Sequence, residues 1–482
     1  MGRPSFAEAT EGQVKDFIIN METVFNQSLW GDEGFSAILS MKSLPEILKI
    51  IARDTSPPLW NIFEHFAFRF FGTQEIVIRG LSLSFFLLAV FFTYKIAAYL
   101  YNKKTGLFAA LLTLFNPFFF TYAFEGRMYS ILALGVTASM YYFLRYFNDE
   151  EVGQSTKFGY VFFGLWALYS HHFSFFAFFV QGIWFLYELI LGKRKRAKKM
   201  IKLFIFIGLG YLPWLIPLYN QTKMVGGGFW LGTPTTKDLS NMFTDYLAKG
   251  IKSPLKIPVL DIEVIDVALL LVIIMLVVRN WFRGIKKSIF FLMWFLLPIV
   301  ATWVISQKFQ SIFFNRYLLY TIPGAMLLLA SNKRGVASYI LIILTLLTFA
   351  SIDYQYFTHP AKLPFREMAN FVKETQKEGD YLINWYTNGT HHIWETKYYG
   401  IPAPIYVPEG SGALPYFVGT ALMDNNDIVR EIPGGAERVG VVTSGPVEKI
   451  EVPGHIQGAS KEFNGLKYIL YIKSSEKTPL RR

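Results

Sequence analysis

Long runs of apolar residues recur along most of the chain, and short polar segments separate them. Crossing the hydrocarbon core of a bilayer takes about 20 mainly apolar residues in a helix. Candidate runs lie at 76–101, 106–124, 128–147, 158–171, 173–191, 201–219, 262–279, 288–306, 316–331 and 336–357. The pattern predicts an α-helical polytopic membrane protein with about ten transmembrane helices.

Longer polar segments divide the chain around these runs. A transmembrane domain is expected over 76–357, with a large loop at 220–261. Residues 1–75 precede it and residues 358–482 follow it. The tail has helical spacing followed by strand-like runs, which predicts a small α/β domain. These segments are 364–377, 380–385 and 467–472.

Composition supports the membrane interpretation. Of the 482 residues, 52% are hydrophobic, 18% are aromatic and only 17% are charged. A soluble protein of this length could not bury so many apolar runs in its core. The chain has no Cys, which excludes disulfides, thiolate metal ligands and cysteine nucleophiles.

The distribution of charge predicts the topology. Placing 192–202, with seven basic residues, in the cytoplasm assigns five loops to that side, and together they carry 17 basic and three acidic residues, a net +14. The whole chain is only +12, so all other residues net −2. The basic excess is therefore a positive-inside pattern, and a nucleic-acid partner is not expected. Residues 1–75, 220–261 and 358–482 then lie on the non-cytoplasmic side, as expected of an integral protein of the plasma membrane.

Carboxylates that could carry chemistry lie on the non-cytoplasmic side before the first span. Asp32 and Glu33 follow Gly31, and Asp54 stands three residues before the pair Pro57 and Pro58. An acidic pair in a loop is often a solvated turn or a helix start, and Asp54 could be a simple capping residue. The prolines are expected to separate two short amphipathic helices that lie at the membrane interface.

Two arginines are expected at non-cytoplasmic ends of spans, against the positive-inside trend. They occur in two short motifs, which are Glu125-Gly126-Arg127-Met128-Tyr129 and Asn315-Arg316-Tyr317. Either Arg could extend to the lipid headgroups, with the Tyr in the aromatic belt. Alternatively, the planar guanidinium is suited to holding a phosphate through paired charged hydrogen bonds.

Two further motifs have weaker signals. His171 and His172 lie at the outer turn between two spans, and no further ligand at suitable spacing indicates a metal site. The glycines 226–228 precede Phe229 and Trp230, which is typical of a flap over a pocket but also of a plain flexible loop. The sequon at Asn388 matters only if the host glycosylates that side.

Taken in order, the motifs at Asp32, Asp54, Arg127 and Arg316 resemble those of the GT-C glycosyltransferases. The specific resemblance is to the dolichyl-phosphate-mannose protein mannosyltransferase-like family and its bacterial relatives that use polyprenyl-phosphate sugars. It covers roughly residues 28 to 380. It implies that Asp32 is the catalytic base, that Asp54 matches the family's Asp before Pro-Pro-Leu, and that the late Arg-Tyr pair lies near the lipid phosphate.

Two features depart from the family pattern. The family often has His directly before its Pro-Pro, whereas this chain has Ser56. The family also places a span before its acidic pair, and residues 1–28 contain no apolar run of that length. A native first helix would bring the total to eleven spans and place the start of the chain inside.

The resemblance implies transfer of a sugar from a polyprenyl-phosphate donor to a hydroxyl of a protein, glycolipid or glycan acceptor. One carboxylate removes the proton of the attacking hydroxyl, which inverts the anomeric carbon, and fixed cations stabilise the departing phosphate. No cofactor or metal is expected. Asp32 suits the first role, with Glu33 orienting it or the acceptor; Asp54, Glu125, Arg127, Tyr129, His171, His172, Arg316 and Tyr317 are the candidate substrate-binding residues. The alternatives are a flippase of lipid-linked sugars, for which an internal repeat is missing, and a non-catalytic homologue.

Overall fold

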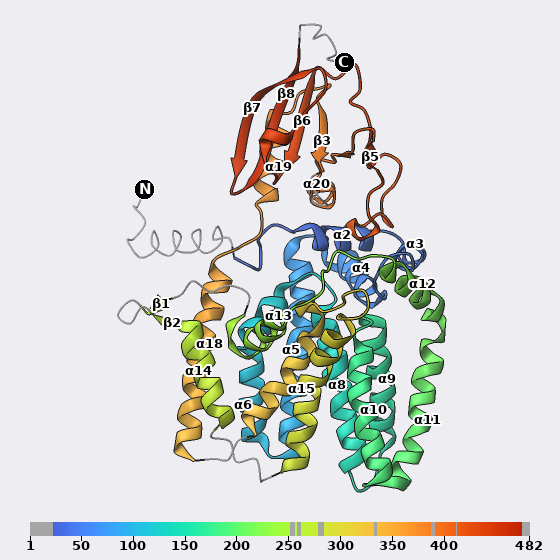
Figure 1. Cartoon of the computed structure of the whole chain (residues 1–482), viewed down its shortest axis with the longest axis vertical. Helices are drawn as coiled ribbons and strands as arrows, with labels where there is room; N and C mark the ends of the chain where they lie inside the picture. The colour runs from blue at the N-terminus through green and yellow to red at the C-terminus, as the bar shows by residue number, and fades with distance from the viewer. Residues whose placement is uncertain are drawn as a thin grey trace, which may run out of the picture.

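The computed structural model describes residues 23–250, 256–257, 262–277, 284–331, 335–386, 391–410 and 412–474. A bundle of helices forms its larger part, and a sheet domain stands at one end of the bundle (Figure 1). The short helices α2, α3 and α4 lie between the two parts (Figure 1). Of the N-terminal segment 1–28, the structure describes residues 23–28. The Asn388 sequon lies outside the described residues.

Each of the ten predicted apolar runs coincides with a helix or a closely spaced series of helices. The bundle consists of α5 (Glu75–Leu100), α6 (Lys103–Leu114), α7 (Pro117–Thr121), η1 (Tyr122–Phe124), α8 (Tyr129–Asn148), α9 (Gln154–Ser170), α10 (Ser174–Ile190), α11 (Arg194–Tyr211), η2 (Leu212–Trp214), α12 (Leu215–Gly226), α14 (Val264–Val277), α15 (Ile285–Ile305), α16 (Asn315–Leu318), η4 (Leu319–Thr321), α17 (Ile322–Ala330) and α18 (Val336–Thr358). Between α12 and α14 lie α13 (Thr236–Thr244), η3 (Asp245–Lys249), β1 (Lys256–Ile257) and β2 (Ile262–Glu263).

Four helical segments of the described part are long and apolar enough to cross a membrane: α5, the continuous segment Arg194–Gly226, α15 and α18. A fifth candidate is the pair Lys103–Leu114 and Pro117–Phe124, which is bent by 58°. Asn116 and Pro117 explain the bend, because the Asn side chain caps the new helix and Pro occupies its first turn. The structure therefore confirms a helical membrane domain, and the number of about ten spans stays a prediction.

Local sequence explains the three short helices between the bundle and the sheet domain. In α2 (Gly31–Ser40) the acidic side chains of the first turn favour the positive end of the helix dipole. A capping box of Ser43 and Glu46 begins α3 (Leu44–Ile51). Pro57 and Pro58 precede α4 (Leu59–Phe71), which confirms the predicted pair of helices around the prolines.

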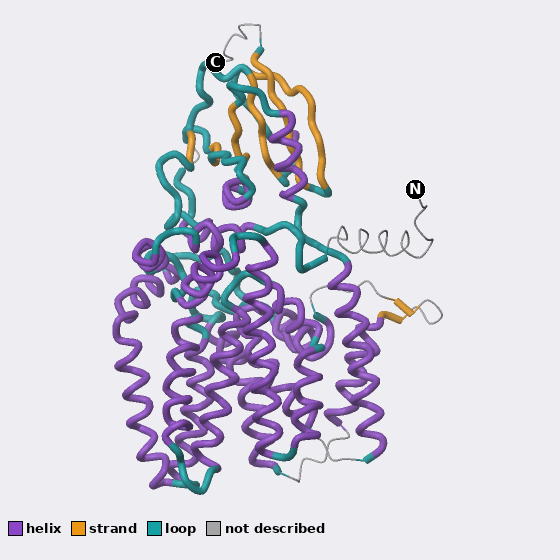
Figure 2. Tube along the Cα trace, turned by 180° about the vertical axis from the view of Figure 1, so that it is seen from behind, coloured by secondary structure: helices purple, strands orange, loops and turns teal. Residues whose placement is uncertain are grey.

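The C-terminal domain contains a six-stranded sheet of order β5-β4-β3-β6-β8-β7. The first four strands in this order are parallel, and β8 and β7 add antiparallel pairs. Figure 2 shows the strands of this sheet together at one end of the molecule, whereas the short β1–β2 pair lies beside the helical bundle. Its elements are α19 (Phe365–Thr375), β3 (Tyr381–Trp385), α20 (Ile393–Tyr398), β4 (Ile405–Tyr406), η5 (Tyr416–Val418), β5 (Ile428–Val429), β6 (Arg438–Thr443), η6 (Val447–Lys449), β7 (His455–Phe463) and β8 (Leu466–Lys473).

Helix α20 packs the sheet domain directly onto α2. A side chain at Gly34 would place its Cβ 3.1 Å from the backbone of Trp394, so glycine permits this close approach. The rings of Phe35 and Trp394 meet edge to face, with centroids 5.4 Å apart. The position of α2, which carries the predicted base, therefore depends on both parts of the protein.

The predicted topology can be tested at two exposed positions that lie near opposite ends of the molecule. Residue 195 lies in the first turn of α11, far from the sheet domain, and residue 460 lies on β7 (Figure 1). The chain has no native Cys, so single cysteines introduced there report without background. In sealed vesicles we expect an impermeant maleimide to label the two positions from opposite sides. Labelling of both from one side would contradict the topology.

Candidate active site

Asp32 lies in the first turn of α2 and faces two arginines from distant parts of the chain. Its carboxylate Oδ2 is 3.1 Å from Nη2 of Arg316, and 37% of the Asp32 side chain is exposed. Arg127 donates from Nη1 to the backbone carbonyl of Asp32 at 3.2 Å. The segments around residues 32, 127 and 316 thus converge on one site.

A cavity of about 380 Å³ surrounds this site, and we call it the Asp32 cavity. Both arginines, Asp54 and Tyr317 line it together with Asp32. The loop after α12 contributes Phe229 and Trp230, and the C-terminal domain contributes Phe417, Val418 and Gly419. A partly exposed carboxylate therefore lies beside two guanidinium groups in a pocket walled by aromatic rings.

Glu33 is adjacent in sequence but has a different environment. Its side chain is fully buried, and it pairs with Arg79 at 3.2 Å and with Lys362 at 2.7 Å. It also accepts a hydrogen bond from the Gly126 backbone N–H at 2.8 Å. Burial would raise the pKa of Glu33, but the two cations and this hydrogen bond outweigh it and lower the pKa. Glu33 does not line the Asp32 cavity, so its geometry suits holding α2 in place rather than contacting a reactant.

Asp54 lies in the turn between α3 and α4 and is largely buried. Burial raises the pKa of its carboxyl, although a hydrogen bond from the Thr55 backbone and the charge of Arg127 act in the opposite direction. A carboxyl that is protonated more readily than a free Asp can donate a hydrogen bond as well as accept one. It can therefore bind a hydroxyl in either sense.

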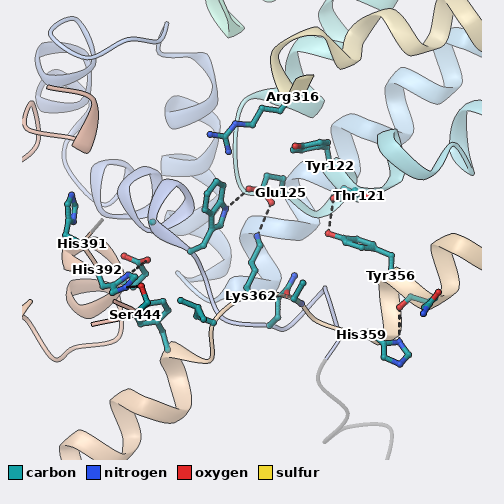
Figure 3. A pocket seen from close by; sticks show the side chains of 18 residues that line it. Thr121, Tyr122, Glu125, Arg316, Tyr356, His359, Lys362, His391, His392 and Ser444 are labelled. Atoms are coloured by element: carbon teal, nitrogen blue, oxygen red, sulfur yellow. Dashed lines mark hydrogen bonds and ion pairs between the residues drawn. The ribbon is translucent and has the colours of Figure 1, made fainter. Parts of the chain in front are cut away.

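A second cavity, of about 690 Å³, lies on the other side of Trp30, and we call it the Lys362 cavity. Figure 3 shows Lys362 extending to Glu125, with the Nζ to Oε2 distance at 2.9 Å. The other oxygen of Glu125 accepts a hydrogen bond from Trp30 Nε1 at 2.5 Å. Burial raises the pKa of Glu125, while Lys362 opposes this. The two cavities share Trp30, Gly31, Arg316 and His391, so they meet beside Asp32.

The remaining predicted residues, Tyr129, His171 and His172, do not line either cavity. Tyr129 is buried, with its ring 5.8 Å from the guanidinium of Arg316. His171 packs against Tyr317 with ring centroids 5.0 Å apart. His172 forms a hydrogen bond to Gln221 at 2.6 Å. Neither histidine lines the two cavities, so the structure places both outside the cluster of charged residues.

Sequence reasoning missed Arg79, Lys362 and Trp30 as parts of the site. Arg79 is fully buried near the N-terminal end of α5 and pairs with Glu33. It also donates hydrogen bonds to the backbone carbonyls of Gln27 and Ser28. Lys362 follows the last span and bridges Glu33 and Glu125. An Arg in the first turns of a predicted span was an available signal, because a buried charge in that position requires a partner. In the described part of the chain, no three His, Asp or Glu side chains form a group that could hold a metal ion.

Glu64 of α4 is a buried carboxyl that links α4 to α2, and its protonation can be tested. Glu64 accepts a hydrogen bond from Ser40 at 2.7 Å, and its other oxygen has no partner among the described residues. Burial raises the pKa of Glu64 to about 8. Because the folded pKa exceeds the unfolded value, the neutral carboxyl contributes full stability below about pH 4.5, and this is lost progressively as the pH rises to about 8.

We therefore expect Glu64→Gln to lose less folding stability than the wild type as the pH rises, because Gln cannot ionise. The difference in melting temperature between the variant and the wild type should grow from pH 5 to pH 8 and then level off. One proton of linkage corresponds to at most about 1.4 kcal/mol per pH unit. Thermal unfolding of the two proteins in the same detergent across this range measures the effect. A difference that does not vary with pH would contradict the assignment.

Comparisons with known proteins show which family and which solved structures the chain is similar to. Residues 55–216 match the model of the dolichyl-phosphate-mannose-protein mannosyltransferase family. The crystal structure of ArnT from Cupriavidus metallidurans in the apo state superposes with a TM-score of 0.63 at 12% identity, covering 96% of this chain and 98% of that one. The ArnT structure bound to undecaprenyl phosphate gives a TM-score of 0.56 at 12% identity, covering 94% and 95%. No curated protein sequence matches the chain.

The chain therefore shares the fold of the ArnT structures, and its similarity to the mannosyltransferase family model over residues 55–216 supports a membrane glycosyltransferase. Within this class, the predicted similarity to the dolichyl-phosphate-mannose protein mannosyltransferase-like family is confirmed. The family model covers the turn after Asp54, Arg127 and both histidines, whereas Asp32 and Arg316 lie outside the matched residues.

Proposed function

We propose that the protein transfers a sugar from a polyprenyl-phosphate donor to an acceptor hydroxyl, with inversion at the anomeric carbon. The reaction takes place on the non-cytoplasmic face of the plasma membrane. The single observation that carries the proposal is the pairing of Asp32 with Arg316 in a cavity that Arg127 also lines. A base beside two fixed guanidinium groups suits the removal of a hydroxyl proton next to a departing phosphate.

The donor class is supported by what the similar proteins are described as using. The matching family model is named for dolichyl-phosphate-mannose, and one similar structure holds undecaprenyl phosphate. Both are polyprenyl phosphates, so a shared phosphate site with an apolar approach suits them. Mannose is one candidate for the transferred sugar, because the matching family model is named for dolichyl-phosphate-mannose.

Each charged residue then has one role in the reaction. Asp32 takes the proton of the acceptor hydroxyl as its oxygen attacks the anomeric carbon, and the bond to the phosphate oxygen breaks. Arg316 and Arg127 stabilise the negative charge that develops on the leaving phosphate. Asp54 binds a hydroxyl of the donor sugar or of the acceptor. Glu33 positions α2 through Arg79 and Lys362, and Glu125 fixes Trp30 and Lys362.

The direct test is turnover of a panel of polyprenyl-phosphate sugars by the purified protein in lipid nanodiscs. Release of the free lipid phosphate reports the reaction, with water as a slow acceptor in the absence of any other. We expect release with at least one donor, and an anomeric product of opposite configuration to the donor. If no donor is turned over by a protein that binds undecaprenyl phosphate, the transferase assignment fails and a flippase becomes the better account.

We expect this activity to survive exhaustive chelation of divalent metal ions. In the proposed mechanism the two guanidinium groups carry the charge stabilisation that a metal ion supplies in other enzymes. The measurement is lipid-phosphate release after dialysis against EDTA, compared with the same sample after adding back Mg²⁺ or Mn²⁺. Loss of activity that the added ion restores would show that Asp32 and Asp54 must be reconsidered as metal ligands.

A further inference from the structure

The C-terminal domain contributes part of the wall of the Lys362 cavity. This part lies at the point of the six-stranded sheet where the strand order reverses. The chain runs from β3 to β4 and β5 on one side, and then returns to β6 on the other side of β3. Parallel sheets bind ligands outside the carboxyl ends of their strands where the strand order reverses in this way. His392 and Glu395 follow β3, and Ser444 follows β6, so this point of the sheet opens into the cavity.

These three side chains form a hydrogen-bonded chain. Ser444 Oγ is 2.9 Å from Nε2 of His392, and Nδ1 of His392 is 3.3 Å from Oε1 of Glu395 (Figure 3). Because a carboxylate only accepts, Nδ1 carries the hydrogen toward Glu395, and Nε2 accepts from the serine hydroxyl. The chain fixes the orientation of the Glu395 carboxylate.

One oxygen of that carboxylate remains available for a ligand. Oε2 of Glu395 is buried and has no hydrogen-bond partner among the described residues, and the whole residue is only 2% exposed. A buried acceptor without a donor is costly, which favours a ligand that supplies one. The carboxylate lies over Gly31, where a Cβ would be 3.9 Å from Oε2. The unpaired oxygen is therefore next to the residue that precedes Asp32.

The other carboxylate that lines the cavity, Glu125, is already paired. Both oxygens of Glu125 bind donors, which are Trp30 and Lys362. Aromatic rings provide much of the remaining wall, and they include Trp30, Tyr122, Tyr356 and Phe365. Rings that can pack on C–H faces, together with a carboxylate that can accept from a hydroxyl, suit a carbohydrate.

We propose that the Lys362 cavity is the acceptor site and that Glu395 accepts a hydrogen bond from a non-reacting hydroxyl of a carbohydrate acceptor. This inference rests on the proposed transferase function. A carbohydrate offers further hydroxyls besides the one that loses its proton to Asp32, whereas a Ser or Thr side chain offers only one. The C-terminal domain then selects the acceptor, and the two arginines of the Asp32 cavity hold the donor.

The test compares acceptor and donor kinetics in Glu395→Gln. This change keeps the shape and the contact with His392 but places an N–H₂ group where Oε2 accepts. With a donor that the wild type uses and a panel of short oligosaccharides as acceptors, we expect the acceptor KM to rise about 10-fold or more, as for loss of a charged hydrogen bond. The turnover number, the affinity for undecaprenyl phosphate and the release of lipid phosphate with water should stay within about 2-fold of wild type.

Three controls make the result specific. Glu462→Gln changes an exposed carboxylate on β7 and should leave the acceptor KM unchanged. Ser444→Ala removes the end of the hydrogen-bonded chain and should raise the KM less than Glu395→Gln does. Melting temperatures near that of the wild type for all three variants exclude a general loss of folding.

Several outcomes would overturn the acceptor site. One is an oligosaccharide KM that Glu395→Gln does not change. Another is use of a Ser/Thr peptide as acceptor by a protein that neither binds oligosaccharides in calorimetry nor glycosylates them. In both cases the protein still releases lipid phosphate with water as the acceptor, so only the acceptor site fails. If the proposed transferase function failed, the wild type would release no lipid phosphate at all.

Discussion

Replacing Asp32 by Asn is expected to reduce sugar transfer by about 100-fold or more, the loss typical of removing a general base. Asn keeps the size of the side chain and can still accept a hydrogen bond from Arg316, but it cannot take a proton. The Asp32 side chain is partly exposed and borders the Asp32 cavity, so it can meet a hydroxyl directly. Affinity for undecaprenyl phosphate and the melting temperature should change little. The measurement is the rate constant of lipid-phosphate release in a single turnover.

Glu33→Gln is the matched control, because the two carboxylates are adjacent in sequence. Glu33 is fully buried between Arg79 and Lys362, so its neutralisation leaves two cations without their shared partner. We expect this variant to lose thermal stability, while properly folded protein keeps the pH dependence of the wild-type reaction. If Asp32→Asn turned over normally, or if only Glu33→Gln abolished transfer in a folded protein, Asp32 would not be the base.

The contrast between these neighbours also shows where sequence reasoning reaches its limit. The motif predicted an acidic pair before the first span, and both residues are in the first turn of α2. Successive helical residues point about 100° apart, so two neighbours can lie in different environments, as Asp32 and Glu33 do. Which of the two faces the Asp32 cavity is decided by the packing of α2 against α4 and α20, and this packing is a property of the tertiary structure.

Helices of the bundle could be predicted because length and apolarity are local properties. Each predicted run coincides with helix, from α5 to α18. The small sheet domain was predicted only in outline, from its last strand and from β3. Strands β4 and β5 have two residues each, which is too short for any alternation of polar and apolar positions to be visible.

The charged cluster behind the site could not be predicted as a cluster. Lys362 binds Glu125 across 237 positions of sequence, and Arg79 binds Glu33 across 46. A single sequence does not specify which distant charges pair. By contrast, Arg127 and Arg316 were expected on the same face as Asp32, because the alternation of spans fixes the face of every loop. The topology argument therefore predicted only that these motifs share one face, and it did not predict that they meet at one site.

Arg316→Lys distinguishes a phosphate-binding arginine from one that merely extends to lipid headgroups. A headgroup contact needs only a long cationic side chain, so Lys would replace Arg with little loss. The Arg316 guanidinium instead lies 4.8 Å from the Phe314 ring and 5.1 Å from the Trp30 ring, and it contacts Asp32. Its planar donors can serve Asp32 and a phosphate oxygen together, which a single ammonium does poorly.

We therefore expect Arg316→Lys to lower kcat by about 10- to 100-fold, because the lost hydrogen bond would be strongest as charge develops on the leaving phosphate. The melting temperature should stay close to wild type, since the charge beside Asp32 is kept. Arg127→Lys should act in the same direction with a smaller effect, because Arg127 also binds the Asp32 backbone. Arg69→Lys on the exposed side of α4 is the control and should have no effect on kcat. An Arg316→Lys enzyme as active as wild type would assign this arginine to the membrane surface and leave the phosphate without its main partner.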